Sequence, residues 1–416
     1  MRLIVQKYGG TSVGTPERIR KAAERIVQTQ REGARVVAVI SAMAGETDNL
    51  IRLAHEMSPQ PDAREMDVLL ATGERAACAL TAMAVNELGA KAVSLSGADA
   101  GILTDRAHTR ARIANISARQ INDLLGEDYI VIVAGFQGQT PEGETTTLGR
   151  GGSDLTAIAL AGALNADSCQ IYTDVDGVFT CDPRVVGDAT KMTEIAYDEL
   201  LEMAGSGSKV MQSRAVEFAK KFGIEFEVRS SFTGAPGTIA KEETANMEDV
   251  VIRGVSIERK QAKLTVDDVG DVPGVAARIF SAIAAGNIVV DMIVQSVGKH
   301  GSTDISFTIH ENDLPSAEKL LQPVMKQVKA SGLVASPHVA KLSVVGIGMR
   351  SHSGVASRLF ECLGRAGINI QLISTSEIKI AVIIDEKDVD LAAQITHKEF
   401  GLASLVANAA AMQPLP

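Results

Sequence analysis

The first 230 residues alternate short apolar runs with stretches of helical periodicity. The apolar runs lie at residues 2–7, 36–40, 91–95, 129–134 and 170–173. They have almost no polar alternation, which is typical of strands buried on both faces of a parallel sheet. Between them, apolar residues recur every three or four positions, in helices predicted from Thr15-Pro16, over residues 65–88 and from about residue 153. The pattern predicts a three-layer α/β domain with a mainly parallel sheet over residues 1–245.

The second half of the chain has a different pattern, which repeats. Residues 241–249 are polar and acidic, as expected of a linker. After them, residues 274–280 match residues 354–360 in five of seven positions. Each copy reads as a strand, a helix and two further strands. This predicts two ferredoxin-like βαββαβ units, over residues 262–337 and 338–410.

Composition narrows the class of protein. The chain has 416 residues, is 45% hydrophobic and carries a net charge of −10 without a basic tract, which argues against nucleic acid as a partner. Its four cysteines form no C-x-x-C pair and its seven histidines are dispersed, so we expect neither a disulfide framework nor a structural zinc site. No apolar h-region opens the chain, and the longest apolar stretch, at 155–164, is too short to span a bilayer. We therefore expect a soluble, cytoplasmic protein with no membrane partner.

The first candidate site is the turn that follows the first predicted strand. Lys7, Gly9 and Gly10 lie between that strand and the next helix, where backbone N–H groups and an ammonium group can face an anion. The turn matches neither the dinucleotide-binding nor the Walker phosphate loop. The interpretation as a phosphate turn therefore competes with an ordinary glycine turn.

A second glycine cluster leads into the helix predicted from residue 153. Residues 148–154 include three glycines and Arg150, which can bind a carboxylate or a phosphate with its guanidinium fork. We expect Ser153 or Asp154 to cap the helix. The alternative is a flexible loop with a capping residue.

Further polar residues follow other predicted strands. Thr173 and Asp174 begin an Asp-rich segment that continues to Arg184; it lacks the ligands of a calcium loop, and we predict no protein metal site. It reads either as the edge of a nucleotide site or as a turn. Thr47 and Glu74 offer a hydroxyl group and a carboxylate, and Glu74 is equally consistent with a cap or a salt bridge.

Taken together and in this order, these motifs resemble the aspartate kinases of the amino-acid kinase superfamily. The resemblance covers almost the whole chain, and Tyr8 stands where many relatives carry Phe. It implies ATP- and Mg²⁺-dependent phosphorylation of the β-carboxylate of L-aspartate to 4-phospho-L-aspartate, the first step of lysine, threonine and methionine biosynthesis.

The resemblance also implies a role for each matching residue. Lys7 and Asp154 would be catalytic. The nucleotide would be bound by Lys7, Gly9, Gly10, Ser41, Thr173, Asp174, Phe179, Asp182, Arg184, Lys209 and Val210. L-aspartate would be bound by Thr47, Glu74, Arg150, Gly151, Gly152 and Ser153, with Glu74 taking the ammonium group and Arg150 the α-carboxylate.

The repeat resembles a pair of ACT domains, which bind amino acids at their interfaces. The resemblance implies that residues 249–257 add a strand to the second unit, and that lysine, threonine or both act as effectors. The effector residues would be Asp271, Gly274, Val275, Ala276, Val289, Asp291, Gln295, Asn369, Ile370, Ser376 and Glu377. It also implies a homo-oligomer formed through these domains. Met247 could start a shorter ACT-only chain, although an ordinary methionine is the favoured interpretation.

Two kinds of alternative stay open. Other members of the superfamily phosphorylate glutamate, acetylglutamate, carbamate or UMP; the tandem repeat and the combination of Glu74 with Arg150 disfavour them. A non-catalytic amino-acid sensor would be expected to lack Lys7, Arg150 or Asp154, and all three are present.

Overall fold

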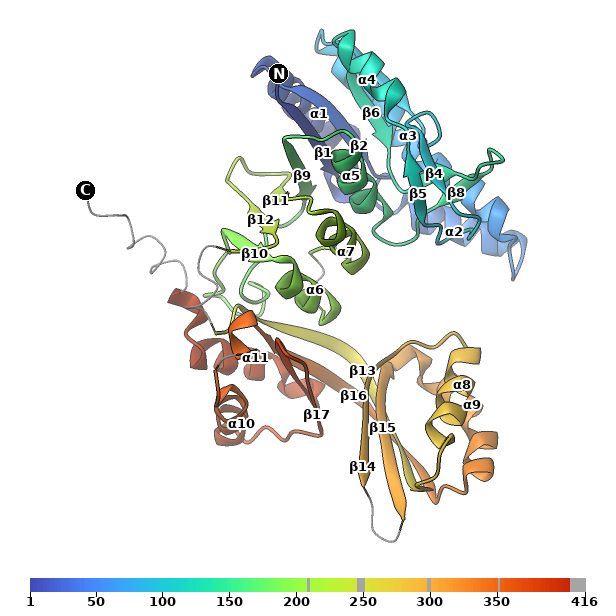
Figure 1. Cartoon of the computed structure of the whole chain (residues 1–416), viewed down its shortest axis with the longest axis vertical. Helices are drawn as coiled ribbons and strands as arrows, with labels where there is room; N and C mark the ends of the chain where they lie inside the picture. Colours follow the sequence, from blue (N-terminus) through green and yellow to red (C-terminus); the bar gives the residue numbers. More distant parts are fainter. Residues whose placement is uncertain (208–209, 245–250, 298–300, 351, 405–416) are drawn as a thin grey trace, which may run out of the picture. The chain divides into compact units, whose positions relative to one another are not determined.

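The computed structural model describes residues 1–207, 210–244, 251–297, 301–350 and 352–404 (Figure 1). It divides into two compact units. Unit 1 takes its described residues from Met1–Val178, Lys191–Ala204 and Lys209–Ala245. Unit 2 takes its described residues from Phe179–Thr190, Gly205–Ser208 and Asn246–Pro416.

Unit 1 is built on a sheet with the strand order β10-β12-β11-β9-β1-β2-β6-β3. Its strands are β1 Leu3–Tyr8, β2 Arg35–Ile40, β3 Ala92–Leu95, β6 Ile130–Ala134, β9 Ser168–Thr173, β10 Glu194–Ala196, β11 Phe226–Ser230 and β12 Thr238–Lys241. Only the pair β11 and β12 is antiparallel, which confirms the predicted, mainly parallel sheet. The predicted strands are buried because their side chains are apolar on both faces.

Helices and a small second sheet complete unit 1. The helices are α1 Pro16–Arg31, α2 Glu46–Met57, α3 Ala63–Glu87, α4 Arg119–Gly126, α5 Gly152–Ala163, α6 Tyr197–Gly205, which continues into unit 2, and α7 Ser213–Phe222. The second sheet has the order β5-β4-β7-β8, with β4 Ile102–Thr104, β5 Ile113–Ile116, β7 Gln137–Gln139 and β8 Thr145–Thr147. Helix α1 begins directly after Thr15, as predicted, and Thr15 caps it: its hydroxyl oxygen accepts from the Arg18 N–H.

Helix α3 is long and apolar enough to cross a membrane by length and composition alone, and half of that apolar window is buried within the fold. Its buried residues include the carboxylates of Asp67 and Glu74. A single helix of this kind is weak evidence for a membrane span, because the core helix of a globular domain has the same composition.

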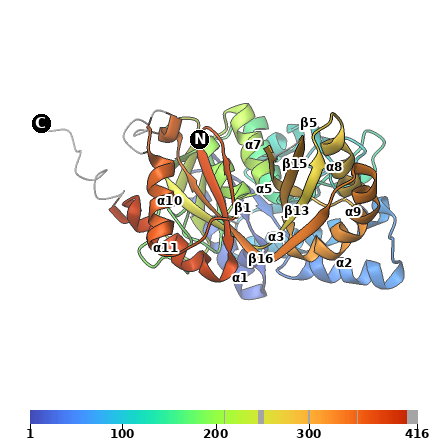
Figure 2. The same cartoon turned by 90° about the horizontal axis from the view of Figure 1, so that it is seen from below.

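Unit 2 contains a six-stranded sheet with the order β14-β15-β13-β16-β18-β17. Its strands are β13 Gly254–Gly270, β14 Val290–Val297, β15 Ser302–His310, β16 Gly332–Val345, β17 Leu372–Thr375 and β18 Lys379–Asp385. Helices α8 Val275–Ala285 and α9 Leu314–Val328 lie at one end, and α10 Val355–Arg365 and α11 Val389–Glu399 at the other (Figure 2).

The two repeat modules share the long strands β13 and β16. The first part of β13, from Gly254 to Glu258, pairs with the end of β16, whereas its second part pairs with β15 and with the start of β16. The register shifts between the two parts, where Lys260 and His338 have left-handed φ angles of 57° and 58°. The first module is therefore a βαββαβ unit. The second runs βαββα from the end of β16 to α11 in the described residues, and residues 254–258 of β13 provide its fourth strand, so both modules share one continuous sheet.

The segment Phe179–Thr190 groups with unit 2, although the sequence placed it in the first domain. Cys181 and Val186 are buried in one core with Leu342 and Leu359. The Thr180 hydroxyl is 2.9 Å from the buried Nε2 of His397 in α11. These contacts join residues that are far apart in the sequence.

Candidate functional site

Four neighbouring parallel strands of unit 1 end at one edge of the sheet. Because β9, β1, β2 and β6 are adjacent and parallel, the residues at their carboxyl ends are neighbours. These residues are Thr173 and Asp174, Lys7 to Gly10, Ser41, and Phe136. The structure thus brings together residues that follow separate strands in the sequence.

A cavity of about 440 Å³ opens at this edge. It is lined by Lys7, Ser41, Thr47, Asp48, Ile51, Leu70, Glu74, Thr109, Phe136, Gly149, Arg150, Gly151, Gly152, Ser153 and Asp154. All six residues predicted to bind the substrate are in this list, together with both residues predicted to be catalytic. Its size suits a small polar molecule.

Lys7 and Asp154 form an ion pair in the cavity wall. The Lys7 Nζ is 2.6 Å from the Asp154 Oδ1, and the two side chains are only 11% and 12% exposed. Lys7 is in β1 and Asp154 in the first turn of α5, so two rigid elements fix the pair. The prediction that Ser153 or Asp154 caps this helix is wrong: Gly151 is the N-cap with a left-handed φ of 72°, and α5 begins at Gly152.

Glu74 brings a carboxylate with spare acceptor capacity to the same cavity. Its Oε1 accepts a hydrogen bond of 3.3 Å from the Ala42 N–H. Its Oε2 is buried and has no hydrogen-bond partner among the described residues. Burial raises the pKa of Glu74 to about 7, with the hydrogen bond from Ala42 opposing the shift. A cation placed beside Oε2 would restore the ionised form.

The glycine turn contributes room for a ligand, because backbone N–H groups of the turn are already hydrogen-bonded within the fold. The Gly9 N–H donates to the Tyr172 carbonyl oxygen over 3.2 Å, and the Ser12 N–H donates to the Gly9 carbonyl oxygen over 2.8 Å. A Cβ on Gly10 would lie 2.9 Å from the Ala42 carbonyl oxygen, and one on Gly9 would lie 3.3 Å from the Lys7 Nζ. Gly9 therefore keeps the approach to Lys7 open, and Gly10 lets the turn pack closely against Ala42.

Several residues predicted to bind the nucleotide lie outside the cavity lining. Thr173 and Asp174 are at the end of β9, and the Thr173 hydroxyl donates to Asp174. Phe179, Asp182 and Arg184 belong to the segment grouped with unit 2, where Arg184 forms an ion pair of 2.7 Å with Asp182. Hydrogen bonds from Arg184 lower the pKa of Asp182. Val210 lies in a turn before α7, and Lys209 lies outside the described residues.

Six residues of the cavity lining were not among the predicted site residues: Asp48, Ile51, Leu70, Thr109, Phe136 and Gly149. Leu70 had a usable signal, because it lies one helical turn before Glu74 on the same face of α3. Thr109 had none, since it belongs to an irregular loop between β4 and β5.

The residues predicted to bind an effector belong to both repeat modules. In the first, Asp271 precedes α8, whose N-cap Gly274 has a φ of 92°, and Val275 and Ala276 form its first turn. Val289 is 78% exposed just before β14. In the second, Asn369 and Ile370 precede β17, and Ser376 and Glu377 lie in the turn after it.

Asp291 and Gln295 lie on β14, an edge strand of the sheet. Asp291 forms an ion pair with Lys341 of β16, and Glu258 of β13 binds the same ammonium group at 2.7 Å. The Lys341 side chain is only 1% exposed. Burial lowers the pKa of Lys341, but the two carboxylates outweigh burial and the pKa is raised.

Family models match both halves of the chain. Residues 2–230 match the model of the amino acid kinase family. Residues 267–323 and 342–400 each match the model of the ACT domain.

Individual relatives match over almost the whole chain. The aspartate kinase of Stutzerimonas stutzeri is 51% identical over 411 residues, which cover 99% of this chain and 100% of that protein. Two crystal structures of E. coli aspartokinase III, one with aspartate and ADP and one with lysine and aspartate, are each 26% identical with a TM-score of 0.78. In both cases the match covers 96% of this chain and 99% of the other.

Proposed function

The chain belongs to the amino acid kinase family, within it to the aspartate kinases, and on this premise we propose that it transfers the γ-phosphoryl group of ATP to the β-carboxylate of L-aspartate. The product would be 4-phospho-L-aspartate, which would enter the synthesis of lysine, threonine and methionine. The E. coli relative crystallised with aspartate and ADP supports this pair of substrates.

The observation that carries the proposal is the match between the charges of the cavity and those of L-aspartate. Glu74 offers a buried carboxylate oxygen to the ammonium group, and Arg150 offers a guanidinium to the α-carboxylate. The β-carboxylate then points towards Lys7, whose ammonium is held by Asp154. A neutral or purely anionic acceptor would leave the Glu74 carboxylate without a cation.

The chemistry requires charge neutralisation and no general base. A β-carboxylate has a pKa of about 4 and is ionised at neutral pH, so the nucleophile is ready when it binds. The difficulty is that an anion must approach a polyanion. Lys7 would neutralise charge on the phosphoryl group in transfer, while Asp154 holds the Lys7 ammonium in place.

The edge of the sheet fits a nucleotide phosphate. Gly9 leaves open the space beside the Lys7 Nζ that a Cβ would fill, and Gly10 lets the turn pack against the Ala42 carbonyl oxygen. Mg²⁺ bound with the nucleotide would neutralise phosphate charge. Among the described residues, three ligand atoms of His, Cys, Asp or Glu side chains come close enough to share one ion only at Glu311, His338 and Glu386 of unit 2. The phosphates would therefore provide most of the ligands of Mg²⁺.

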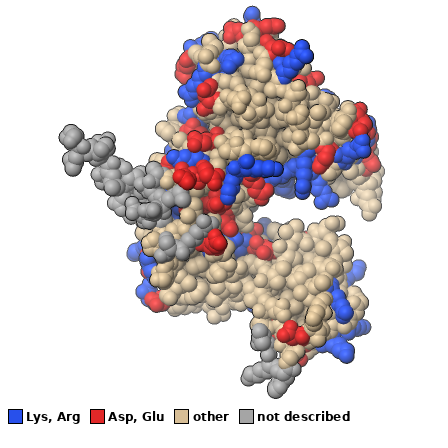
Figure 3. Space-filling model, viewed as in Figure 1, with Lys and Arg blue, Asp and Glu red and all other residues tan. Residues whose placement is uncertain are grey.

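For regulation, we propose that lysine, threonine or both bind the ACT modules. The E. coli relative crystallised with lysine supports lysine as an effector. Val289 and Ile293 expose 78% and 53% of their surface on or beside an edge strand, and Figure 3 shows wide uncharged areas on the visible face of unit 2. These features support a homo-oligomer formed through this unit. Met247, the possible start of an ACT-only chain, lies outside the described residues.

The four cysteines are free and buried, which supports a reducing, cytoplasmic location.

The activity is tested by measuring ADP release from ATP and Mg²⁺ with L-aspartate and, separately, with L-glutamate. We expect release with L-aspartate and at least tenfold lower kcat/KM with L-glutamate. Equal rates, or release that is independent of the amino acid, would contradict the proposal.

The same assay with lysine and threonine, singly and together, tests regulation. Gln295→Ala and Ser376→Ala should relieve inhibition and leave the uninhibited kcat unchanged. Equal loss of activity and of inhibition in both variants would argue against separate sites.

A further inference from the structure

We propose that Asp67 is the positioning residue that holds two walls of the substrate cavity together: the loop that carries Thr109 and the loop that carries Arg150. Asp67 lies beneath the cavity and does not line it. The inference rests on the proposed function, because it concerns how the same cavity recognises L-aspartate.

Asp67 is a fully buried carboxylate whose donors come from two separate segments. The Thr109 N–H donates to its two oxygens over 2.9 and 3.1 Å. The His108 Nδ1 lies 2.7 Å away, and the Thr147 hydroxyl donates to the Oδ1. A buried carboxylate is costly unless donors surround it, so the fold keeps both segments in place around this group.

The first segment is held in a conformation that it would not adopt unaided. Thr109 has a φ of 67°, a left-handed value that is energetically costly for a β-branched residue. The hydrogen bonds from its N–H to Asp67 oppose this cost. Thr109 also lies against the glycine loop, since a Cβ on Gly149 would be 3.3 Å from the Thr109 carbonyl oxygen.

The second segment leads directly to Arg150. Thr147 ends β8, three residues before Arg150, and its carbonyl oxygen accepts from the Ala111 N–H over 2.9 Å. Arg214 of α7 donates to the carbonyl oxygens of both Ala111 and Leu148. Asp67 and Arg214 thus tie the two loops together from two different helices.

The position of Asp67 on α3 relates these walls to Glu74. The two carboxylates are seven residues apart, which is about two helical turns and the same face of the helix. Leu70 lies between them and lines the cavity. One rigid helix face therefore sets the distance between the proposed ammonium acceptor and the Arg150 loop.

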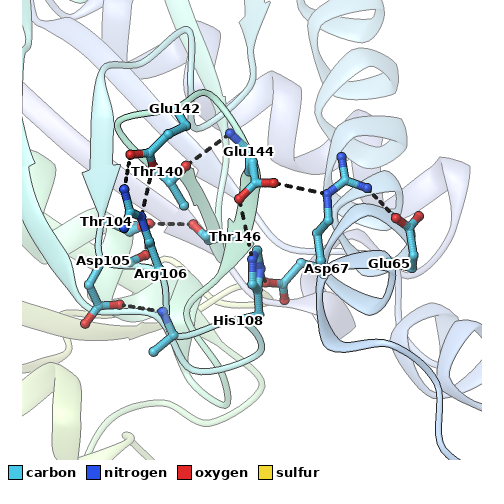
Figure 4. A network of polar contacts seen from close by, with 12 residues as sticks. Glu65, Asp67, Thr104, Asp105, Arg106, His108, Thr140, Glu142, Glu144 and Thr146 are labelled. Carbon is cyan, nitrogen blue, oxygen red and sulfur yellow. Dashed lines mark hydrogen bonds and ion pairs between the residues drawn. The ribbon is translucent and has the colours of Figure 1, made fainter.

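Polar contacts around the small sheet stiffen this arrangement (Figure 4). Glu144 lies 3.9 Å from the His108 Nε2 and forms an ion pair of 3.4 Å with Arg64 of α3. The Thr104 and Thr146 hydroxyls are 2.7 Å apart. Because the walls are held rigidly, a substrate longer by one methylene group is rejected by a surface that does not yield.

The test is the variant Asp67→Asn, which keeps the size of the side chain but replaces one acceptor oxygen by a donor. We expect the KM and the calorimetric Kd for L-aspartate to rise about tenfold, in line with the loss of a hydrogen bond to a charged group. The KM for ATP should stay within about twofold, because Lys7 and the glycine turn are not displaced. The ratio of kcat/KM for L-aspartate to that for L-glutamate should fall.

Asp62→Ala is the matched control on the same helix. Asp62 caps α3 by accepting from the Arg64 and Glu65 N–H groups, so its loss lowers stability without touching either loop. We expect a lower melting temperature and an unchanged KM for L-aspartate. Thr147→Val, which removes one donor, should give a smaller shift in the same direction as Asp67→Asn and serves if that variant does not fold.

Normal affinity for L-aspartate in Asp67→Asn or, if that variant does not fold, in Thr147→Val would overturn the inference, as would a parallel rise in both KM values. Wild-type protein that binds L-aspartate but does not phosphorylate it would contradict the proposed function. The Kd values of wild type and Asp67→Asn for L-aspartate would still test the role of Asp67. Wild-type protein that does not bind L-aspartate would overturn both.

Discussion

Each unit contains a buried lysine that is paired with carboxylate, and the two sites differ in what surrounds the pair. Within the part of the chain that the structure describes, Lys7 of unit 1 is bound by Asp154 alone, and it faces a cavity of about 440 Å³. Lys341 of unit 2 is bound by Asp291 and Glu258 from two other strands, and its side chain is 1% exposed. Both are strand lysines with similar ion-pair distances.

The comparison shows that a buried ion pair does not by itself mark an active site. Lys341 has its charge compensated on two sides by carboxylates, so it can link strands but has no room for a ligand. Lys7 has one partner and an open side, and the nearby Glu74 has an oxygen without a partner among the described residues. Charged groups that lie beside a cavity and still lack a partner are a better sign of a functional site than burial of an ion pair.

The largest expected effect is the loss of kcat when Lys7, which faces the cavity, is replaced. Lys7→Met should lower kcat by about 10²-fold or more, because it removes the cation beside the phosphoryl group and leaves the backbone intact. Steady-state kinetics and a thermal melt on the same sample measure both properties. A near-normal kcat would show that Lys7, although it faces the cavity, has no larger role in catalysis than Lys341.

The next effect concerns the unpartnered carboxylate of Glu74, whose pKa is raised from 4.5 to about 7. Between these values the folded protein binds more protons than the unfolded chain, so wild-type stability falls as the pH rises through this range. Glu74→Gln does not titrate, so its stability relative to wild type should increase by about 3 kcal/mol from pH 4.5 to pH 7 and then level off.

Urea unfolding of the ligand-free protein at several pH values measures this difference for Glu74→Gln. Saturating L-aspartate should reduce the difference at high pH, because its ammonium group would pair with Glu74 in wild type only. If the free energies of unfolding of wild type and Glu74→Gln differed by the same amount at every pH, the Glu74 carboxylate would not be desolvated in the cavity.

The smallest effect is expected when Lys341, which is enclosed by two carboxylates, is replaced. Lys341→Met should lower the stability of unit 2 by about 1–2 kcal/mol, less than for a fully buried pair, because Asp291 and Glu258 are each 34% exposed and water replaces part of the lost interaction. The uninhibited kcat should stay within about twofold of wild type. A loss of kcat like that of Lys7→Met would remove the distinction between the two lysines.

The fold was predictable where the pattern of apolar residues along a segment reflects how deeply that segment is buried. The strands that became β2 and β6 are apolar on both faces, and β1 and β9 contain continuous buried stretches; this signal survives without tertiary information. The small sheet of β4, β5, β7 and β8 was not predicted. Its strands are three or four residues long, too short to show a period.

The candidate site was predictable where residues directly follow buried strands, as Lys7 and Ser41 do. Thr109 and Asp67 were missed because their roles depend on a contact across 42 residues of sequence that no local pattern encodes. Phe179 and Arg184 show the opposite problem: they follow β9 closely in the sequence, yet their segment groups with unit 2 because Cys181 and Val186 are buried there.

The shared strands β13 and β16 have a consequence for protein engineering. A cut that removes either ACT module divides both strands and leaves the other module without an edge that it needs. Modules from different enzymes should therefore be exchanged as a pair, and a chimera that swaps one alone should expose unpaired backbone and aggregate.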